Sequence, residues 1–341
     1  MINVAINGFG RIGRTTFKAG LLKKEINFVA VNDLTDTKTL AHLLKYDTVY
    51  GRCNRPISYD DKHLIVDGKK VLVLAEKDPG KLPWKKLKID VVLECTGFFT
   101  SEKLSQPHLR AGAKRVIISA PAKGGNVGTF IIGVNHDQYQ GQAIINNASC
   151  TTNSIAPVAA VMHSVFGVRK AIMTTVHGYT ADQRLQDAPH KDLRRARAAA
   201  VNIVPTTTGA AISTTETIPE LKGLFDGIAL RVPVPVGSLA DFTFLLKKKT
   251  TVTEVNEAFI KASKTPRFKG VLEVTNDPIV SADVIGNPAS AVVDLGLTKV
   301  VDGDLVKIIA WYDNEWGYSH RLAEMAIAVG KQLKARFKGR G

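Results

Sequence analysis

Residues 1–22 read MINVAINGFGRIGRTTFKAGLL, and this stretch decides the fold of the first half of the chain. Residues 1–7 form a short apolar run typical of a buried strand. The spacing GxGxxG follows at 8–13, and a helix-compatible stretch at 14–22 comes directly behind it. A strand, a glycine turn and a helix in this order are typical of a unit that binds a dinucleotide. The stretch therefore predicts a Rossmann-type domain at the start of an α/β protein.

The three glycines of this motif have separate physical roles. Gly8 permits a tight turn, Gly10 lets backbone amides approach a pyrophosphate, and Gly13 allows the helix to pack closely on the strand. A second apolar run, 26–31, ends just before Asp33, where an acidic side chain can accept hydrogen bonds from an adenosine ribose. Because a carboxylate there would repel the 2′-phosphate of NADP, Asp33 favours NAD.

Other apolar runs end at polar residues that can meet a ligand. Thr96 follows the run at 90–94, and Ser119 follows the run at 116–118. Ligands of an open parallel sheet bind at the carboxyl ends of its strands, so we expect Thr96 and Ser119 along the path of a bound dinucleotide. We also predict a helix at 37–44 and strands at 64–66, 71–74, 129–132 and 143–145.

The stretch ASCTTN, residues 148–153, predicts the reactive centre. A strand is expected just before it, and a helix-compatible stretch at 154–166, broken at Pro157, follows it. This arrangement places Cys150 in the first turn of a helix, where unpaired backbone N–H groups and the helix dipole favour a thiolate. We therefore predict that Cys150 is a nucleophile.

His177 is the candidate partner of that thiol. It follows an apolar run, 170–176, much as Cys150 follows its own strand, so both side chains are placed to face one crevice. Imidazole is the usual base beside a reactive thiol. On spacing alone, a purely structural histidine is the alternative.

Downstream segments offer groups that bind phosphate. The stretch TTTG at 206–209 clusters hydroxyls and backbone amides, and Arg231 lies in a predicted strand. Arginine and threonine hydroxyls are common phosphate ligands, although Arg231 could equally form a structural ion pair. The polar segment 182–200 is too irregular for one helix and predicts a functional loop or an oligomer contact.

The second half of the chain lacks a regular alternation of strands and helices. Residues 239–246 alternate apolar and polar side chains, as in a strand covered on one face. Further strands are expected near 270–274, 291–295 and 306–311, and a last helix opens at 311–318. This pattern predicts an α+β domain with a mixed, largely antiparallel sheet.

Composition excludes several classes of protein. The 341 residues are 45% hydrophobic, and no apolar run approaches the roughly 18 to 20 residues that span a bilayer. Three cysteines without a CxxC spacing indicate neither a disulfide framework nor a metal site. The chain starts with a predicted strand rather than a signal segment, so we expect a cytoplasmic protein with no membrane partner.

The net charge of +15 allows two interpretations. A basic field can steer anionic ligands such as dinucleotides and sugar phosphates, or it can mark a surface that binds nucleic acid. Its local clusters, at 85–88, 247–249 and 334–340, do not interleave with several aromatic residues as a stacking platform would. We favour a solvated surface and keep nucleic-acid binding as the alternative.

Four motifs of this chain resemble those of glyceraldehyde-3-phosphate dehydrogenases. They are NGFGRIGR at 7–14, ASCTTN at 148–153, TVH at 175–177 and WYDNE at 311–315. The resemblance covers essentially the whole chain, and the motifs stand in the order that the family has. It points to the phosphorylating, NAD-type, bacterial-like members.

The resemblance implies a domain organisation and an assembly. Residues 1–150 would form an NAD-binding Rossmann domain that a C-terminal helix at 315–341 completes, and residues 151–314 would form the catalytic domain. The subunits would form a homotetramer, in which the segment 182–200 reaches a neighbouring subunit's cofactor.

The resemblance also implies roles for individual positions. Cys150 would be the nucleophile and His177 its base, while Thr180 and Arg231 would hold the phosphate of the substrate. The site for inorganic phosphate and the reacting end of the substrate would consist of Ser149, Thr151, Arg195, Thr208 and Gly209. Besides the three glycines and Thr96, NAD would contact Arg11, Ile12, Asp33, Lys77, Ser119 and Asn314.

The implied reaction is the glycolytic oxidation of glyceraldehyde 3-phosphate to 1,3-bisphosphoglycerate. The Cys150 thiolate would attack the aldehyde to give a thiohemiacetal, and His177 would accept its hydroxyl proton as hydride passes to NAD. Inorganic phosphate would then cleave the acyl thioester. Erythrose-4-phosphate dehydrogenase is the alternative activity, because it shares the fold and this pair of residues.

Three positions depart from the family pattern. Lys77 stands where Arg is usual, which keeps the charge but loses the planar fork. Ser154 stands where a second cysteine is frequent, so Cys150 has no thiol neighbour one helical turn away. Ala188 stands where many NAD-specific members have Leu, which leaves more room near the adenosine ribose and makes some use of NADP conceivable.

Overall fold

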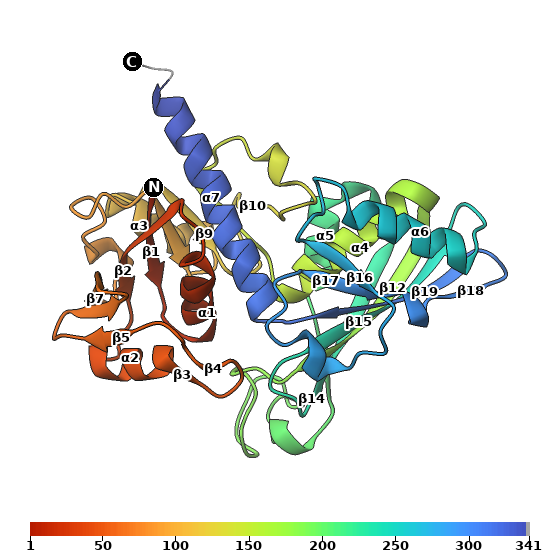
Figure 1. Ribbon diagram of the computed structural model, residues 1–341, viewed down its shortest axis with the longest axis horizontal. Helices are drawn as coiled ribbons and strands as arrows, with labels where there is room; N and C mark the ends of the chain where they lie inside the picture. The colour runs from red at the N-terminus through yellow and green to blue at the C-terminus, as the bar shows by residue number, and fades with distance from the viewer. Residues whose placement is uncertain (339–341) are drawn as a thin grey trace. The chain divides into compact units, whose positions relative to one another are not determined.

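The computed structural model describes residues 1–338, which fold into two compact units (Figure 1). Unit 1 comprises 1–130, 136–148 and the C-terminal part of the chain from Ser319 onward. Unit 2 comprises 131–135 and 149–318. Each unit has its own sheet, and each is described by itself.

The sheet of unit 1 is parallel around β1. The strand β1 (Ile2–Asn7) pairs in parallel with β2 (Ile26–Asn32) on one side and with β8 (Val91–Glu94) on the other. The chain passes from β1 to β2 on one side and later returns to β8 on the other. This reversal of the strand order leaves a crevice for ligands at the carboxyl ends of β1 and its neighbours. Within the described residues the full order is β10 (Gly128–Thr129), β11 (Ile144–Asn146), β9 (Arg115–Ile118), β8, β1, β2, β7 (Lys69–Leu74), β6 (His63–Val66) and β5 (Ile57–Tyr59), the last two antiparallel to their neighbours.

The glycine turn after β1 is set by close packing. Gly8 has a φ of +91°, and a Cβ there would lie 2.7 Å from the backbone nitrogen of Thr96. A Cβ on Gly13 would lie 2.2 Å from the carbonyl oxygen of Gly8. Only glycine therefore fits at either position. The helix α1 (Arg11–Gly20) starts at Arg11 rather than at residue 14, because Gly10 already serves as its N-cap.

The other helices of unit 1 follow polar caps. Asp36 caps α2 (Thr37–Lys45) by accepting a hydrogen bond from the backbone N–H of Thr39, and Ser101 caps α3 (Glu102–Arg110) in the same way. A two-stranded ribbon of β3 (Tyr46–Asp47) and β4 (Gly51–Arg52) follows α2.

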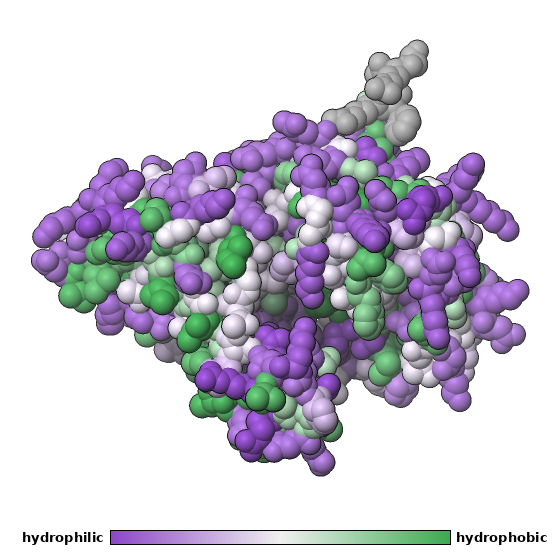
Figure 2. Space-filling model, turned by 180° about the vertical axis from the view of Figure 1, so that it is seen from behind, coloured by the Kyte–Doolittle hydropathy of each residue, from purple (hydrophilic) through white to green (hydrophobic). Residues whose placement is uncertain are grey.

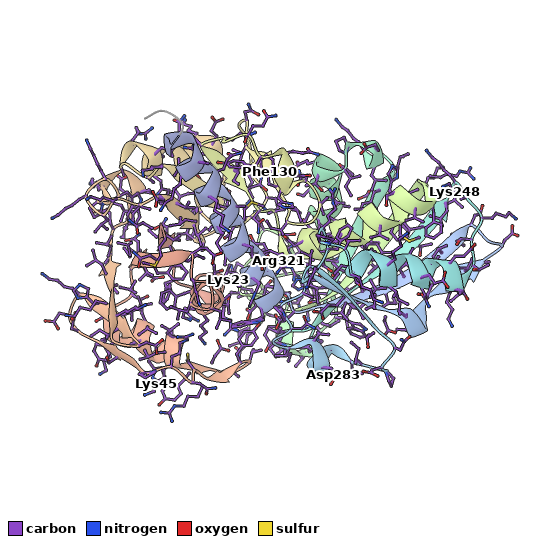
Figure 3. The ribbon with its side chains drawn as sticks, turned by 45° about the horizontal axis from the view of Figure 1, so that its top comes forward. Lys23, Lys45, Phe130, Lys248, Asp283 and Arg321 are labelled. Carbon is purple, nitrogen blue, oxygen red and sulfur yellow. The ribbon has the colours of Figure 1, made fainter. Side chains whose placement is uncertain are left out.

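The last helix, α7 (Trp316–Lys338), packs within unit 1 from Ser319 onward. The Ser319 hydroxyl donates to the Thr15 hydroxyl of α1 at 2.7 Å. Glu324 accepts from both Lys23 and Arg321, two side chains labelled in Figure 3. The C-terminal helix expected over 315–341 therefore exists as far as Lys338, and residues 339–341 lie outside the described part.

Unit 2 contains a mixed sheet that is mostly antiparallel. Its central strand β12 (Val168–Gly178) pairs in parallel with β14 (Phe225–Val232) and antiparallel with β15 (Ser238–Leu246). Among the described residues the order is β13 (Val204–Thr207), β14, β12, β15, β19 (Leu305–Tyr312), β17 (Ala291–Asp294) and β16 (Leu272–Thr275), with β18 (Lys299–Val301) paired to β19.

Three helices lie together on one face of this sheet: α4 (Cys150–Phe166), α5 (Ala210–Thr217) and α6 (Val252–Ser263) (Figure 1). Two predictions need correction here. The helix α4 is continuous through Pro157, because its residues on both sides of Pro157 are buried and their packing offsets the missing N–H. The strand expected at 129–132 ends at Thr129, because the N–H of Ile131 turns to the side-chain oxygen of Asn135.

Hydrophilic residues cover most of the face shown in Figure 2, with hydrophobic residues gathered in separate patches. Among residues 1–338, no helix combines the length and apolar character that crossing a membrane requires. The most exposed apolar side chains of unit 2 are those of Leu185, Leu193 and Val201, each at least 77% exposed.

Candidate active site

A thiol and an imidazole meet in unit 2. Cys150 is the first residue of α4, and Ser149 caps that helix by accepting a hydrogen bond from the backbone N–H of Thr152 at 3.1 Å. His177 lies near the end of β12 and is 2% exposed. The Cys150 Sγ lies 3.4 Å from the His177 Nε2, which is hydrogen-bond distance for sulfur. Helix α4 and strand β12 therefore bring together the two side chains that the sequence predicted as a pair.

The backbone sets which nitrogen of His177 faces the sulfur. The His177 Nδ1 lies 2.7 Å from the carbonyl oxygen of Gly178. Nδ1 contacts both an acceptor, this carbonyl oxygen, and a donor, the Arg231 guanidinium; the neutral tautomer that carries its proton on Nδ1 leaves the lone pair of Nε2 facing the sulfur. His177 can thus take a proton from the Cys150 thiol.

Arg231 lies against the same imidazole. In the parallel pairing of β12 with β14, His177 and Arg231 are direct partners. The guanidinium contacts the ring at Nδ1 and donates to the carbonyl oxygen of Gly178 at 3.2 Å. Strand register therefore places a fixed positive charge beside the reactive pair.

Burial keeps both reactive groups neutral. Desolvation raises the pKa of the Cys150 thiol above its usual value, although the Arg231 charge and hydrogen bonds at the helix start act in the opposite direction. Desolvation, with the Arg231 charge, lowers the pKa of His177 to about 3. Desolvation thus opposes the thiolate that the Arg231 charge and the hydrogen bonds at the helix start favour.

Tyr312 is a member of this site that sequence reasoning did not assign. Its hydroxyl lies 3.1 Å from the Thr151 hydroxyl and 2.7 Å from the Thr175 hydroxyl. Its ring packs edge-on against His177, with centroids 6.0 Å apart. Tyr312 therefore ties the first turn of α4 to the strand that carries His177. The motif at 311–315 was the only sequence signal.

A second polar cluster surrounds Asp182. Its carboxylate accepts from the Thr180 hydroxyl and from Arg195 at 2.6 Å. The Arg195 guanidinium also donates to the Thr206 hydroxyl at 2.9 Å. The charge of Asp182 raises the pKa of His177 slightly against the larger effect of burial. Asp182 thus brings Thr180 and Arg195 together near the reactive pair, although no role was predicted for Asp182 from the sequence.

Thr208 and Gly209 lie at the start of α5. The Thr208 hydroxyl accepts from the backbone N–H of Ala210 at 3.2 Å, and Gly209 is the N-cap. Space around Gly209 is open, since a Cβ there would meet no atom within 4 Å. Arg195 donates to the carbonyl oxygen of Thr207 at 3.3 Å, which links this corner to the Asp182 cluster.

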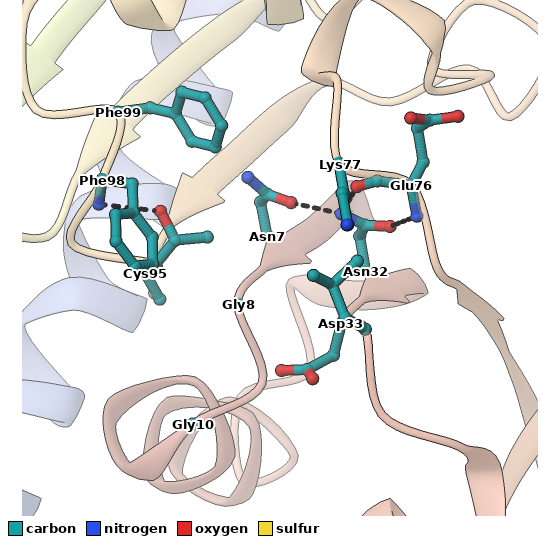
Figure 4. A pocket seen from close by; sticks show the side chains of 12 residues that line it. Asn7, Gly8, Gly10, Asn32, Asp33, Glu76, Lys77, Cys95, Phe98 and Phe99 are labelled. Atoms are coloured by element: carbon teal, nitrogen blue, oxygen red, sulfur yellow. Dashed lines mark hydrogen bonds between the residues drawn. The ribbon is translucent and has the colours of Figure 1, made fainter.

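Unit 1 holds a separate pocket of about 350 Å³ at the carboxyl ends of its parallel strands. Figure 4 shows loops from several strands converging on it. Asp33 points into this space and accepts a hydrogen bond from the backbone N–H of Phe9 at 2.8 Å. The residues that line the pocket are Asn7, Gly8, Gly10, Asn32, Asp33, Leu34, Glu76, Lys77, Cys95, Thr96, Phe98 and Phe99.

Only some of the predicted cofactor residues line this pocket. Gly8, Gly10, Asp33, Lys77 and Thr96 do, whereas the others lie elsewhere. The Arg11 side chain pairs with Asp47 at 2.9 Å, and Gly13 packs against the turn. The backbone N–H of Ser119 donates to the carbonyl oxygen of Glu94, and Ile12 belongs to the first turn of α1. Asn314 belongs to unit 2, where its side-chain oxygen accepts a hydrogen bond from the Ser238 hydroxyl at 2.8 Å.

The sequence analysis missed most of the remaining lining. Phe98 and Leu34 are strongly exposed, with 80% and 61% of their surface accessible, which is unusual for large apolar residues. Phe98 follows β8 and Leu34 follows β2. Because ligands of such sheets bind beyond the strand ends, their positions could have indicated that they line the pocket.

Comparisons with known proteins relate the chain to one family. Residues 2–102 match the family model of the glyceraldehyde 3-phosphate dehydrogenase NAD binding domain, and residues 149–314 match that of the C-terminal domain. The glyceraldehyde-3-phosphate dehydrogenase of Streptomyces coelicolor is 54% identical over 336 residues, which cover 97% of this chain and 99% of that protein. Those of Mycobacterium tuberculosis and Geobacillus stearothermophilus are 52% and 51% identical over the same shares of each chain.

Proposed function

We propose that this chain, which belongs to the glyceraldehyde-3-phosphate dehydrogenase family, oxidises glyceraldehyde 3-phosphate with NAD and inorganic phosphate to 1,3-bisphosphoglycerate. The observation that carries the proposal is the contact between the Cys150 Sγ and the His177 Nε2. A nucleophile with a base at this distance supports covalent catalysis on an aldehyde. The cytoplasm is the proposed compartment.

In the proposed reaction, proton movement depends on His177. Its Nε2 takes the thiol proton of Cys150 as the sulfur adds to the aldehyde carbon. His177 returns that proton to the alkoxide oxygen, which gives the thiohemiacetal hydroxyl, and the same proton leaves again to Nε2 when the thioester forms. NAD, when bound, supplies the hydride acceptor. The backbone N–H groups at the start of α4 stabilise the developing oxyanion.

The pocket of unit 1 fits a dinucleotide. A Cβ on Gly10 would meet no atom within 4 Å, so open space lies above the N-terminus of α1, where free N–H groups attract a pyrophosphate. The Asp33 carboxylate is available for ribose hydroxyls, and Lys77 adds a positive charge at the rim. Of the predicted residues outside this pocket, Arg11 and Ile12 would contribute their backbone N–H groups.

Two groups of residues in unit 2 would hold phosphate. Arg231 and Thr180 would bind the phosphate of the substrate, which fits the position of Arg231 beside His177. Arginine and hydroxyl donors together suit a phosphate dianion. The groups proposed for inorganic phosphate and the reacting end of the substrate are Ser149, Thr151, Arg195, Thr208 and Gly209.

We also propose the roles of the two parts of the chain and a homotetramer. Residues 1–150 with the C-terminal helix bind NAD, and residues 151–314 carry out catalysis. The strongly exposed Leu185 and Leu193 support a subunit contact for the segment 182–200, since isolated domains rarely leave such residues in water.

The test is reduction of NAD by the purified protein with glyceraldehyde 3-phosphate, followed by the absorbance of the reduced nicotinamide. We expect fast turnover that requires inorganic phosphate and is weak with NADP. Turnover only with erythrose 4-phosphate would replace the proposed substrate. Turnover independent of inorganic phosphate would show that water, rather than phosphate, cleaves the thioester.

A further inference from the structure

A buried carboxylate lies beneath the cofactor pocket and has no part in the proposed reaction. Glu94 is the last residue of β8 and is 1% exposed. Its Oε1 accepts from the backbone N–H of Thr96 at 2.8 Å and from the Thr96 hydroxyl. Its Oε2 accepts from the Asn7 amide at 2.6 Å and lies 3.1 Å from the His108 Nε2. Both oxygens therefore act as acceptors, each with two partners.

The protonation of His108 follows from its other neighbour. The Trp84 indole N–H, which can only donate, lies 2.9 Å from the His108 Nδ1. Nδ1 is therefore the acceptor, and the neutral ring carries its proton on Nε2, pointing at Glu94. Trp84, His108 and Glu94 thus form a fully buried chain of hydrogen bonds that fixes the orientation of the carboxylate.

The two ends of this carboxylate reach different loops of the pocket. Through Thr96, Glu94 holds the loop after β8, because the backbone N–H of Phe98 donates to the Thr96 hydroxyl at 3.0 Å. Through Asn7, it reaches Asn32, whose amide donates to the Asn7 side-chain oxygen at 2.7 Å.

Asn32 extends the connection to the loop that carries Lys77. Its side chain accepts from the backbone N–H of Glu76 at 2.9 Å and donates to the Glu76 carbonyl oxygen at 2.8 Å (Figure 4). The backbone carbonyl of Asn32 also accepts from the N–H of Gly8 at 2.8 Å. The side chains of Asn7 and Asn32 therefore relay the position of the carboxylate to the loop of Lys77, and the Asn32 backbone extends it to the Gly8 turn.

We infer that Glu94 is a positioning residue for NAD: its carboxylate, oriented by His108, holds the Gly8 turn and the loops of Lys77 and Phe98 in the arrangement that receives the dinucleotide. The inference rests on the proposed use of NAD. Glu94 itself does not line the pocket, so it acts through Thr96 and Asn7.

The test compares Glu94→Gln with Asp90→Asn. Glutamine puts an amide N–H₂ where two donors now point, which leaves buried donors unpaired. Asp90 is a matched control because it is also buried, directly precedes the same strand, and accepts from Lys114 and from the N–H of Asn3 at the opposite end of β8. Calorimetric titration of each folded protein with NAD measures the dissociation constant without catalysis.

We expect Glu94→Gln to raise the dissociation constant for NAD about tenfold, equivalent to one lost buried hydrogen bond, with Asp90→Asn within about twofold of the parent. Steady-state kinetics should show a higher KM for NAD with little change in kcat or in the KM for the aldehyde. Equal NAD affinity in Glu94→Gln and the parent, or equal losses in both variants, would overturn the inference.

Two further results decide the remaining cases. If Glu94→Gln does not fold, His108→Phe removes one donor to Glu94 without touching the pocket, and unchanged NAD affinity in that variant would overturn the inference. If the parent protein does not bind NAD, the proposed function fails and the inference fails with it. If the parent binds NAD, a negative result with the variants contradicts only the inference about Glu94.

Discussion

The reactive pair of unit 2 and the cofactor pocket of unit 1 are built in different ways. Cys150 lies at the start of a helix and His177 lies in a strand, so regular elements fix both side chains. The residues packed around them reduce their contact with water. The pocket is lined by loops beyond strand ends, and side chains such as Asn32 hold those loops together. In the proposed mechanism, catalysis therefore depends on a few atoms held by a helix and a strand. NAD binding, in contrast, is shared among many contacts from loops.

This comparison predicts abrupt losses in one region and graded losses in the other. In the proposed mechanism neither the Cys150 sulfur nor the His177 imidazole has a substitute, so removal of either should abolish most of the activity. Removal of one loop contact leaves the others in place, so the dissociation constant changes by a modest factor. Four substitutions or measurements test the contrast, in order of expected effect.

The largest effect is expected from Cys150→Ser. The hydroxyl is a far weaker nucleophile at neutral pH, so kcat should fall by at least about 10³-fold while the NAD dissociation constant stays the same. Turnover and calorimetric titration measure the two quantities. Cys53→Ser, which changes a free cysteine of unit 1, is the control and should retain activity. Full activity in Cys150→Ser would refute the covalent mechanism.

The next effect is expected from His177→Asn, which removes the base. General base catalysis contributes about 10²- to 10⁴-fold, so kcat/KM for the aldehyde should fall within that range. His42→Asn, at an exposed position of α2, should behave as the parent protein. A loss below about tenfold would show that another group accepts the proton.

The third prediction concerns how the reactivity of the Cys150 thiol depends on pH. Burial raises the pKa of the thiol above its usual value, so the thiolate fraction should rise about tenfold per pH unit from pH 7 to 9. His177, with a pKa of about 3, stays neutral across this range and adds no acid limb. The rate of alkylation by iodoacetamide without cofactor measures this. A rate independent of pH would indicate a preformed thiolate and imidazolium pair.

The smallest effect is expected from Asp33→Asn in the pocket. Removal of the carboxylate charge relieves the repulsion of a 2′-phosphate, so the ratio of kcat/KM for NADP to that for NAD should rise about tenfold. Activity with NAD should fall only modestly, because the amide oxygen can still accept from the N–H of Phe9. An unchanged ratio would shift the choice of cofactor to another region, with Ala188 as the next position to change.

Sequence reasoning succeeded where a short motif encodes a local geometry. The family and the fold class predicted from four motifs are confirmed by the family models that match both parts of the chain. The turn at Gly8, the helix start at Cys150 and the strand before His177 each carry a local sequence signal. The roles of the individual site residues remain predictions that the experiments above test.

Sequence reasoning failed where long-range packing decides. Pro157 was expected to interrupt a helix, yet the buried sides of α4 keep it continuous. The helix α5 and the strand β13 were not predicted, since they are short and the periodicity of α5 is weak; the helix α6 was not predicted either, although Thr251 and Glu254 form a capping box at its start. Tyr312 lies 161 positions after Thr151, and no local pattern could reveal that their hydroxyls meet.

The sequence by itself indicated the glycine turn and the order of the two parts of the chain, and it offered the pairing of Cys150 with His177 as a hypothesis. The glycine turn follows from residue types at fixed short spacing. Only the tertiary structure decided that Arg231 stands beside His177, that desolvation raises the pKa of Cys150, and that Glu94 underlies the cofactor pocket. Strand register and burial bring together residues far apart in the chain, and the electrostatics of a site depend on those neighbours.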